Sequence, residues 1–500
     1  MQKLGLKLKE NLKSSLPVRV MQFGEGNFLR GFIDYMIFKM NEKELFNGRV
    51  VAIQPTPRGR VVPKLKEQDC LYTTSLHGIE NDKAVEYNEI INSIADALNP
   101  YDSAQWQQTI EYALNPDVRF FVSNTTEAGL TYTQEQLFSD TCPQSFPGKL
   151  TELLYRRFEH FTKDGLDPSV IVMPCELLDN NGSILRDLVL KHAYDNNLDE
   201  SFADFINNKC TFLNTLVDRV VSGFPADNAD EYFAKFGYED NLITCGETFH
   251  FMAIEGDDSL NDILPFSKAG LNVVICSDIS PYRLRKVRLL NGGHTSSVPL
   301  AYLSGLETVD QMMSNKVFGA FVRRVLFDDI MPHINLDRPM LESFASSVIN
   351  RFSDPMMHHQ LSSILMNSTS KINARVLPSL LDNLKASSVC KRLCLSVAAY
   401  ICLYKDAGSV PVTVIRDDKS IGSFSDDKSC VDMMIHAWSL YCGTLDGARA
   451  VVDYILDKTT LLSPDLAKYP QAREQIAVML QSLLDKGALK TIEAVIECRQ

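Results

Sequence analysis

The feature that most constrains the fold is a strand, a glycine turn, a helix and a second strand, all near the start of the chain. An apolar run at 18–23 leads directly into the turn GEGNFLR at 24–30, and a second apolar run occupies 49–54. Between the two runs, apolar residues recur at steps of three and four from Phe28 to Met40, which is the period of a helix with one buried face. This spacing has the length of a βαβ crossover and predicts the start of a parallel sheet.

Further short apolar runs, at 118–123, 169–173 and 271–276, alternate with helical patterns. Continuous apolar strands between helices predict a parallel sheet covered on both faces. Beyond about residue 280, helical periodicity dominates, at 317–327, 340–349, 360–366, 386–404, 433–441 and 472–484. We therefore expect an α/β chain with two domains. The first, at 1–277, is a Rossmann-like doubly wound sheet that binds a dinucleotide, and the second, at 278–500, is mostly α-helical and binds the substrate.

Composition excludes several classes of protein. With 45% apolar and 23% charged residues, the chain is typical of a globular protein. The formal net charge of −13 disfavours a nucleic-acid partner. Twelve cysteines without a CxxC pair indicate reduced thiols, the amino-terminal segment lacks the apolar core of a signal peptide, and the longest apolar stretch is too short for a bilayer. We expect a cytoplasmic protein without a membrane partner; a monomer and a small homo-oligomer both remain open.

The glycine turn is a candidate dinucleotide site. Gly24 and Gly26 would let backbone N–H groups approach a pyrophosphate at the start of the helix. The third glycine of GxGxxG is missing, so a plain strand-to-helix turn is an alternative. The acidic residue expected after the second strand is also missing. Gln54 stands there and could bind a ribose hydroxyl, whereas Arg58 or Arg60 could meet a 2′-phosphate, which leaves the choice between NAD and NADP open.

A polar loop, SNTTEAG at 123–129, follows a later strand. It falls at the carboxyl edge where doubly wound sheets bind ligands, which makes Asn124, Thr125 and Glu127 candidate cofactor contacts. The same residue types also cap helices, and this alternative stays open.

The segment KVRLLNGGH at 286–294 carries the most specific candidate chemistry. In a regular α-helix, Lys286, Asn291 and His294 would share one broad face. A ketone that becomes an alcohol needs a proton donor and a second hydrogen-bond donor at its oxygen. Lys286 could supply the proton, Asn291 could hold the oxygen and His294 could anchor a neighbouring hydroxyl. An amphipathic helix with a solvated lysine is the alternative, but the Gly292-Gly293 pair, at about 1 kcal/mol each relative to alanine, calls for a packing or functional reason.

Other charged segments could line a substrate pocket. Asp218 and Arg219 adjoin an apolar run, and His359 and Lys371 lie in a region rich in arginine. An anionic sugar acid would need such cations for its carboxylate, although structural salt bridges are the alternative. No HxxxH or His-Cys cluster is present, so we expect no metal site.

The turn at 24–30 and the Lys286-x4-Asn291-x2-His294 pattern resemble the signatures of the mannitol dehydrogenase family of long-chain polyol and sugar-acid dehydrogenases. The similarity is greatest to the sugar-acid members and runs from about residue 18 to about 380. It rests on five phrases, QFGEGNFLR at 22–30, SNTTEAG at 123–129, PCELLDNNG at 174–182, TLVDR at 215–219 and ESFAS at 342–346.

This resemblance implies a metal-independent, NAD-linked interconversion of D-tagaturonate and D-altronate in hexuronate breakdown. It implies that Lys286 is the general acid/base, that Asn291 steadies the oxyanion and that His294 borders the substrate. The candidate cofactor contacts are Phe23, Gly24, Gly26, Asn27, Phe28, Arg30, Gln54, Asn124, Thr125 and Glu127. The candidate substrate contacts are Asn181, Asp218, Arg219, His359 and Lys371.

Two departures from the family concern the substrate pocket. Mannitol-oxidising relatives carry Asp-Asn-Leu where this chain has ELL at 176–178, and Ser363 replaces an arginine eight residues before Lys371. These changes fit a ligand other than a polyol and leave the carboxylate-binding group open. Reduction of D-fructuronate, which differs in stereochemistry, and a catalytically silent nucleotide-binding protein of the same fold are the alternatives.

Overall fold

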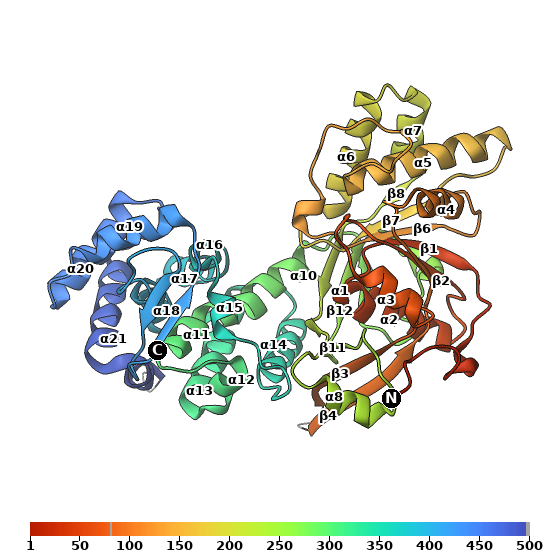
Figure 1. Ribbon diagram of the computed structural model, residues 1–500. Helices are drawn as coiled ribbons and strands as arrows, with labels where there is room; N and C mark the ends of the chain where they lie inside the picture. Colours follow the sequence, from red (N-terminus) through yellow and green to blue (C-terminus); the bar gives the residue numbers. More distant parts are fainter. Residues whose placement is uncertain (81–82, 497–500) are drawn as a thin grey trace. The chain divides into compact units, whose positions relative to one another are not determined.

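The computed structural model describes residues 1–80 and 83–496 (Figure 1). The chain forms two compact units, residues 1–280 and 281–500. The first unit is built on a parallel sheet and the second is mostly helical, as the sequence predicts.

The first unit is organised around a six-stranded sheet with the order β5-β2-β1-β6-β7-β8. All neighbouring strands are parallel. The strands are β1 (Val18–Phe23), β2 (Arg49–Ile53), β5 (Ile94–Leu98), β6 (Phe120–Ser123), β7 (Ile171–Pro174) and β8 (Thr211–Phe212). When these six strands are numbered in chain order, their order across the sheet is 3-2-1-4-5-6, the doubly wound order, in which ligands bind where the order reverses. Here the reversal lies between the carboxyl ends of β1 and β6.

Both faces of this sheet are buried. In β2, Val50 and Ala52 pack into the core on one face, and Val51 and Ile53 pack into the core on the other. Because side chains alternate along a strand, a sheet covered on both sides requires continuous apolar strands. The helices of this unit are α1 (Asn27–Gly31), α2 (Ile33–Glu42), α3 (Val61–Glu67), α4 (Ser103–Ala113), α5 (Phe146–Lys163), α6 (Asn181–Asp195), α7 (Glu200–Asn208), α8 (Ala229–Phe236) and α9 (Leu260–Ile263).

Two smaller sheets complete the unit. The predicted strand at 271–276 is present as β13 (Val273–Cys276), but it lies in a separate sheet with β12 (Phe251–Glu255) and β9 (Thr215–Asp218), so its assignment to the parallel sheet was wrong. A four-stranded sheet contains β3 (Tyr72–Glu80), β4 (Lys83–Ile91), β10 (Val221–Gly223) and β11 (Thr244–Glu247). The sequence pattern missed β4 because most of its side chains are exposed or half-buried.

The helix predicted after the glycine turn is interrupted at Phe32, which separates α1 from α2. Arg219 Nη1 donates to the carbonyl oxygen of Gly31 at 2.7 Å, which removes that oxygen from the regular helical pattern. A Cβ on Gly31 would lie 3.1 Å from a Val221 methyl carbon and 3.2 Å from that of Thr244, so glycine permits this close packing.

The second unit confirms the six helical segments predicted from periodicity, which correspond to α13, α14, α15, α18, α19 and α21. Its helices are α10 (Ser280–Arg285), α11 (Gly292–Leu303), α12 (Val309–Ser314), α13 (Lys316–Arg324), α14 (Arg338–Phe352), α15 (Leu361–Leu365), α16 (Ser368–Arg375), α17 (Leu377–Lys385), α18 (Lys391–Cys402), α19 (Lys428–Trp438), α20 (Leu445–Lys458) and α21 (Pro470–Ile496). A hairpin of β14 (Val412–Ile415) and β15 (Ile421–Phe424) was not predicted. Among the described helices, none combines the length and apolarity needed to cross a membrane.

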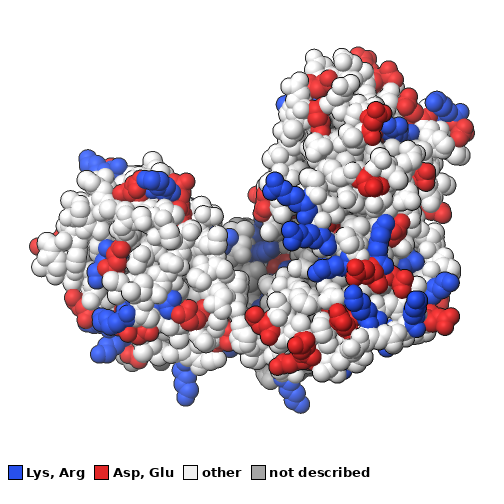
Figure 2. Space-filling model, viewed as in Figure 1, with Lys and Arg blue, Asp and Glu red and all other residues white. Residues whose placement is uncertain are grey.

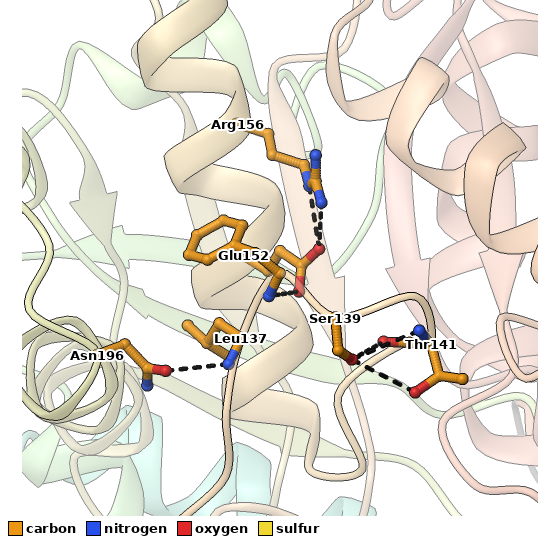
Figure 3. Close-up of polar contacts among 7 residues, drawn as sticks. Leu137, Ser139, Thr141, Glu152, Arg156 and Asn196 are labelled. Carbon is orange, nitrogen blue, oxygen red and sulfur yellow. Dashed lines mark hydrogen bonds and ion pairs between the residues drawn. The ribbon is translucent and has the colours of Figure 1, made fainter.

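The long segment between β6 and α5 is fixed by side chains of α5 and by the end of α6 (Figure 3). The backbone N–H of Leu137 donates to Asn196 Oδ1 at 2.9 Å, and that of Phe138 donates to Glu152 Oε2 at 2.9 Å. Glu152 is buried and also accepts from Arg156 Nη2 at 2.8 Å. These bonds hold in place the chain that leaves the carboxyl edge of β6.

Charged side chains of both signs are interspersed on the visible faces of the two units (Figure 2). Many of them form exposed ion pairs, such as Arg449 with Glu474 and Arg338 with Glu342. Exposed pairs of this kind contribute little to stability, about 1 kcal/mol or less each.

Candidate active site

The glycine turn brings its backbone against the neighbouring loop. Gly24 has φ +125°, and a Cβ there would lie 2.9 Å from a Leu29 methyl carbon and 3.0 Å from the carbonyl oxygen of Asn124. Only glycine adopts this conformation without strain. Gly26 and Asn27 are exposed at the start of α1, so their backbone is accessible to a ligand.

Arg30 stabilises this turn from within. Its side chain is 2% exposed, Nη2 donates to Asn27 Oδ1 at 2.7 Å, and Nε donates to Thr244 Oγ1 at 3.2 Å. Nη1 also donates to the carbonyl oxygen of Glu25. These bonds give Arg30 a structural role, and its predicted contact with the cofactor stays a prediction.

The remaining predicted cofactor residues differ in their accessibility. The ring of Phe23 is fully buried and packs on Phe146 with ring centroids 4.9 Å apart, so only its backbone can contact a ligand. Gln54 is 1% exposed, and its Nε2 donates to the carbonyl oxygen of Thr56 at 2.7 Å, which ties down the loop after β2. Phe28, Asn124 and Thr125 are partly buried, and Glu127 is exposed.

Glu176, which sequence reasoning treated only as a departure from the family, organises the loop after β6. Its Oε1 accepts from the backbone N–H of Thr125 at 2.9 Å and from Thr125 Oγ1 at 3.0 Å, and its Oε2 accepts from Ser123 Oγ at 3.0 Å. Burial raises the pKa of this carboxyl. The next residue in the loop, Thr126, has φ +67°, an unusual conformation for a β-branched residue that often marks a functional site. The position of Glu176 two residues after the end of β7, at the ligand-binding edge, is the signal that could have identified it.

A buried carboxyl lies behind the glycine turn. Asp34 is fully buried, its Oδ2 accepts from Gln22 Nε2 at 3.1 Å, and the same Nε2 donates to the carbonyl oxygen of Gly24 at 3.0 Å. Burial raises the pKa of Asp34 to about 7. The native state therefore retains this proton at pH values where the unfolded chain has released it, and stability falls as pH rises from about 4 to 7.

We expect Asp34→Asn to remove this pH dependence. At pH 8 the variant should be more stable than the wild type by up to about 4 kcal/mol, and at pH 4.5 the two should differ by less than about 1 kcal/mol. Urea unfolding at both pH values measures the difference. An equal difference at the two pH values would contradict a buried proton on Asp34.

Three predicted substrate residues lie at β9 and α6 of the first unit. Asn181 is fully buried, its Nδ2 donates to the carbonyl oxygen of Glu176 at 3.0 Å, and its Oδ1 accepts from the N–H of Thr215 at 2.9 Å. This bonding gives Asn181 a structural role, and its predicted contact with the substrate stays a prediction. Asp218 ends β9 and is also buried.

Arg219 likewise has a structural role. Besides Gly31, its guanidinium donates to the carbonyl oxygens of Thr248 and Phe249, each at 3.0 Å. Burial lowers the pKa of Arg219 to about 10. Because three backbone carbonyls occupy the group, a role in substrate binding stays an untested prediction.

In the second unit, the segment that carries Lys286 and Asn291 is a π-helix, η3 (Lys286–Asn291), followed by α11. The N–H of Gly292 donates to the carbonyl oxygen of Val287, five residues earlier. The regular α-helical spacing assumed for Lys286, Asn291 and His294 was therefore wrong over this turn. Isolated π turns occur frequently at functional sites.

The glycine pair after this turn has a packing reason. A Cβ on Gly292 would lie 3.0 Å from the carbonyl oxygen of Arg375, and one on Gly293 would lie 3.0 Å from a Leu326 methyl carbon and 3.5 Å from Phe352 Cε2. The pair lets α16 and α14 approach the start of α11 closely.

His294 lies in an aromatic and cationic cluster. Its ring stacks on Phe352 with centroids 3.9 Å apart and meets His359 edge-on at 5.7 Å. Burial, followed by the charges of His359, Arg351, Arg375 and Lys371, lowers the pKa of His294 well below its ordinary value. His294 is therefore neutral near pH 7 and offers one donor and one acceptor.

Five predicted residues belong to the second unit, and two of them, His359 and Lys371, act on His294 through their charge. His359 has its pKa lowered by burial and by Lys371, and Lys371 Nζ donates to the carbonyl oxygen of Ile364 at 2.8 Å. Asn291 and Lys286 are partly buried at the two ends of η3. Over residues 1–80 and 83–496, no group of three or more His, Cys, Asp or Glu side chains is arranged to hold a metal ion.

Comparison with known proteins places this geometry in a family. The model of the mannitol dehydrogenase Rossmann domain matches residues 18–268, and that of the mannitol dehydrogenase C-terminal domain matches residues 278–484. The chain is 40% identical over 488 residues to an altronate oxidoreductase of Halalkalibacterium halodurans, covering 97% of this chain and 94% of the relative. It is 38% identical over 478 residues to an altronate oxidoreductase of Escherichia coli O1:K1, covering 95% and 96%.

Two solved structures share the fold. Pseudomonas fluorescens mannitol 2-dehydrogenase, in a ternary complex with NAD and D-mannitol, has a TM-score of 0.72 at 20% identity, with 100% of each chain covered. A D-sorbitol dehydrogenase in substrate-free form has a TM-score of 0.78 at 20% identity, with 98% of this chain and 100% of that chain covered. Because both domain models match and relatives are similar along nearly the whole length, the chain belongs to the mannitol dehydrogenase family.

Proposed function

We propose that this chain is an NAD-dependent oxidoreductase that interconverts D-tagaturonate and D-altronate. The observation that carries the proposal is 40% identity to an altronate oxidoreductase over 97% of the chain. The two family models span the glycine turn and the KVRLLNGGH segment as well. We assign cofactor binding to residues 1–277 and substrate binding to residues 278–500.

The nucleotide fits the carboxyl ends of β1 and β6. Gly24, without a Cβ, allows the backbone of Asn124 to approach closely. Gly26 and Asn27 are exposed, and Glu176 fixes the loop after β6. NAD rather than NADP is supported by the structural relative solved with NAD. Gln54 does not decide between the two cofactors, because its side chain is bonded to its own loop. When bound, the nicotinamide supplies the hydride that reduces the ketone carbon.

Residues of the second unit transfer the proton. Lys286 Nζ donates a proton to the oxygen as negative charge develops there, and the amide of Asn291 donates a hydrogen bond to the same oxygen. Neutral His294 hydrogen-bonds a neighbouring hydroxyl of the open-chain sugar acid. In the oxidative direction, Lys286 accepts the proton from the alcohol.

The free cysteines of the described chain support a cytoplasmic location.

The function is tested by following NADH and NADPH oxidation with D-tagaturonate, D-fructuronate and neutral ketoses. We expect NADH with D-tagaturonate to give the highest kcat/KM, at least about 10-fold above D-fructuronate. Preference for D-fructuronate would instead assign the chain to the stereochemical alternative. NADH binding without oxidation by any keto acid would indicate a silent nucleotide-binding protein.

Replacing Glu176 by Ala should weaken NADH binding. The change leaves the partly buried N–H of Thr125 without its acceptor and frees the loop after β6, which we expect to raise the Kd for NADH by about 10- to 100-fold. Fluorescence titration of NADH measures it, and Glu159→Ala, at an exposed position on α5, is the matched control. An unchanged Kd in a folded Glu176→Ala protein would remove this loop from the cofactor site.

A further inference from the structure

Helix α16 carries two cations on one face. Lys371 and Arg375 are four residues apart and both are partly buried. Like charges at this spacing repel each other, which destabilises a helix unless an anion lies between them. The ammonium of Lys371 is oriented by the carbonyl oxygen of Ile364, 2.8 Å from Nζ.

Arg375 differs from Arg30 and Arg219 because no group among the described residues compensates its charge. Within the described residues, its guanidinium forms no ion pair and no hydrogen bond, and burial alone lowers its pKa. By contrast, Arg219 donates to three backbone carbonyls, and Arg30 donates to one backbone carbonyl and two side-chain oxygens. A partly buried cation without a partner is costly, and a bound anion would offset that cost.

Arg375 also lies beside the residues proposed to act on the ketone. Its carbonyl oxygen is 3.0 Å from the position of a Cβ on Gly292, so this end of α16 packs against the residue that follows Asn291. The charges of Arg375 and Lys371 are among those that, after burial, lower the pKa of His294. All these contacts lie within the second unit.

Asp426, an acidic group whose charge acts on Lys371, is engaged elsewhere. Asp426 accepts from the N–H of Thr369 at 2.9 Å, from Thr369 Oγ1 at 2.7 Å and from the hydroxyl of Tyr404. It therefore anchors the first turn of α16 and acts on Lys371 only through its charge. The helix is fixed at its start, and its cationic side chains remain available for a ligand.

We infer that Arg375 binds the carboxylate of the keto sugar acid, with Lys371 as a second cation, and that it selects acids over neutral ketoses. A guanidinium presents paired N–H groups that match a carboxylate, and this match fixes the orientation of the substrate as well as its charge. The inference rests on the proposed function, because it names the group that would recognise the acid end of the same substrate.

The test compares D-tagaturonate with D-tagatose, which carries a hydroxymethyl group in place of the carboxylate. We expect Arg375→Gln to lower kcat/KM for D-tagaturonate by about 100-fold or more, mainly through KM, and to change that for D-tagatose by less than about threefold. For D-tagaturonate, the kcat/KM of Arg375→Lys should lie between those of the wild type and Arg375→Gln. Arg323→Gln, an exposed arginine of α13, should match the wild type.

A binding measurement separates this inference from the proposed function. Calorimetry of D-altronate with NAD-loaded wild type and Arg375→Gln does not depend on turnover, and an unchanged Kd for NADH shows that the variant is folded. Loss of D-altronate binding in the variant alone supports the inference even if no keto acid is reduced. D-tagaturonate kinetics and D-altronate binding within about threefold of wild type in Arg375→Gln would overturn it. Failure of the wild type to bind or reduce either acid would overturn both proposals.

Discussion

Replacing Lys286 by Ala is expected to lower kcat for D-tagaturonate reduction by about 10²- to 10⁴-fold while leaving the Kd for NADH within about threefold of wild type. The expected loss is large because the ammonium supplies the proton at the oxygen where charge develops, and η3 offers no second amine at this position. Steady-state kinetics with NADH and a separate NADH titration measure the two quantities. Added methylamine should restore part of the activity, because a small amine can occupy the vacated space.

The matched control for this variant is Lys385→Ala, an exposed lysine at the end of α17 in the same unit. It should retain wild-type kcat and NADH binding. Near-normal turnover in Lys286→Ala would remove Lys286 from the mechanism and leave the proton donor to be identified among the other groups of the second unit.

The second large effect concerns stability rather than catalysis. Asp329 and Arg392 form a buried bidentate ion pair, with both N–O distances at 2.6 Å. Arg392→Met leaves the Asp329 carboxylate buried without its cation, and we expect this to destabilise the second unit by about 3–5 kcal/mol. For a unit of this size, the unfolding midpoint should fall by about 6–20 °C. Differential scanning calorimetry measures the shift.

A double variant shows whether the unpaired charge causes the loss. Arg392→Met combined with Asp329→Leu removes both charges and should recover most of the stability, since a buried pair is often replaceable by apolar side chains. Arg449→Met, which breaks an exposed pair, should change the free energy of unfolding by about 1 kcal/mol or less. If Arg392→Met alone stays within that range, the ion pair is not needed to hold the unit together.

Periodicity was sufficient to predict the doubly wound sheet and the helical second unit. The strands of the parallel sheet are buried on both faces, as β2 shows, and this burial requires the continuous apolar runs seen in the sequence. Strand β4 is mostly exposed and gives no such signal. The run that became β13 has the same composition as a core strand, and only tertiary pairing with β12 places it in a different sheet.

The chemistry was harder to predict than the fold, because it depends on what surrounds each charged group. The sequence distinguishes neither Arg30 nor Arg219 from Arg375. Yet the first two donate to backbone carbonyls, and the third has no such acceptor in the part of the chain that the structure describes. The π turn at η3 has no signal in the periodicity, and neither has the close approach of the Arg375 carbonyl to Gly292 at its end. Glu176 stands at the correct edge of the sheet, but its bonds to the loop after β6 follow only from the pairing of β6 with β7.

The central claim is that the chain moves a hydride between the nicotinamide and the ketone carbon of a keto sugar acid. Its most direct test is reduction of D-tagaturonate with NADH that carries deuterium at the transferable position, followed by mass and NMR analysis of the product. We predict D-altronate with one deuterium on the carbon that carried the ketone. Product without deuterium at that carbon, or no product at all, would contradict the account.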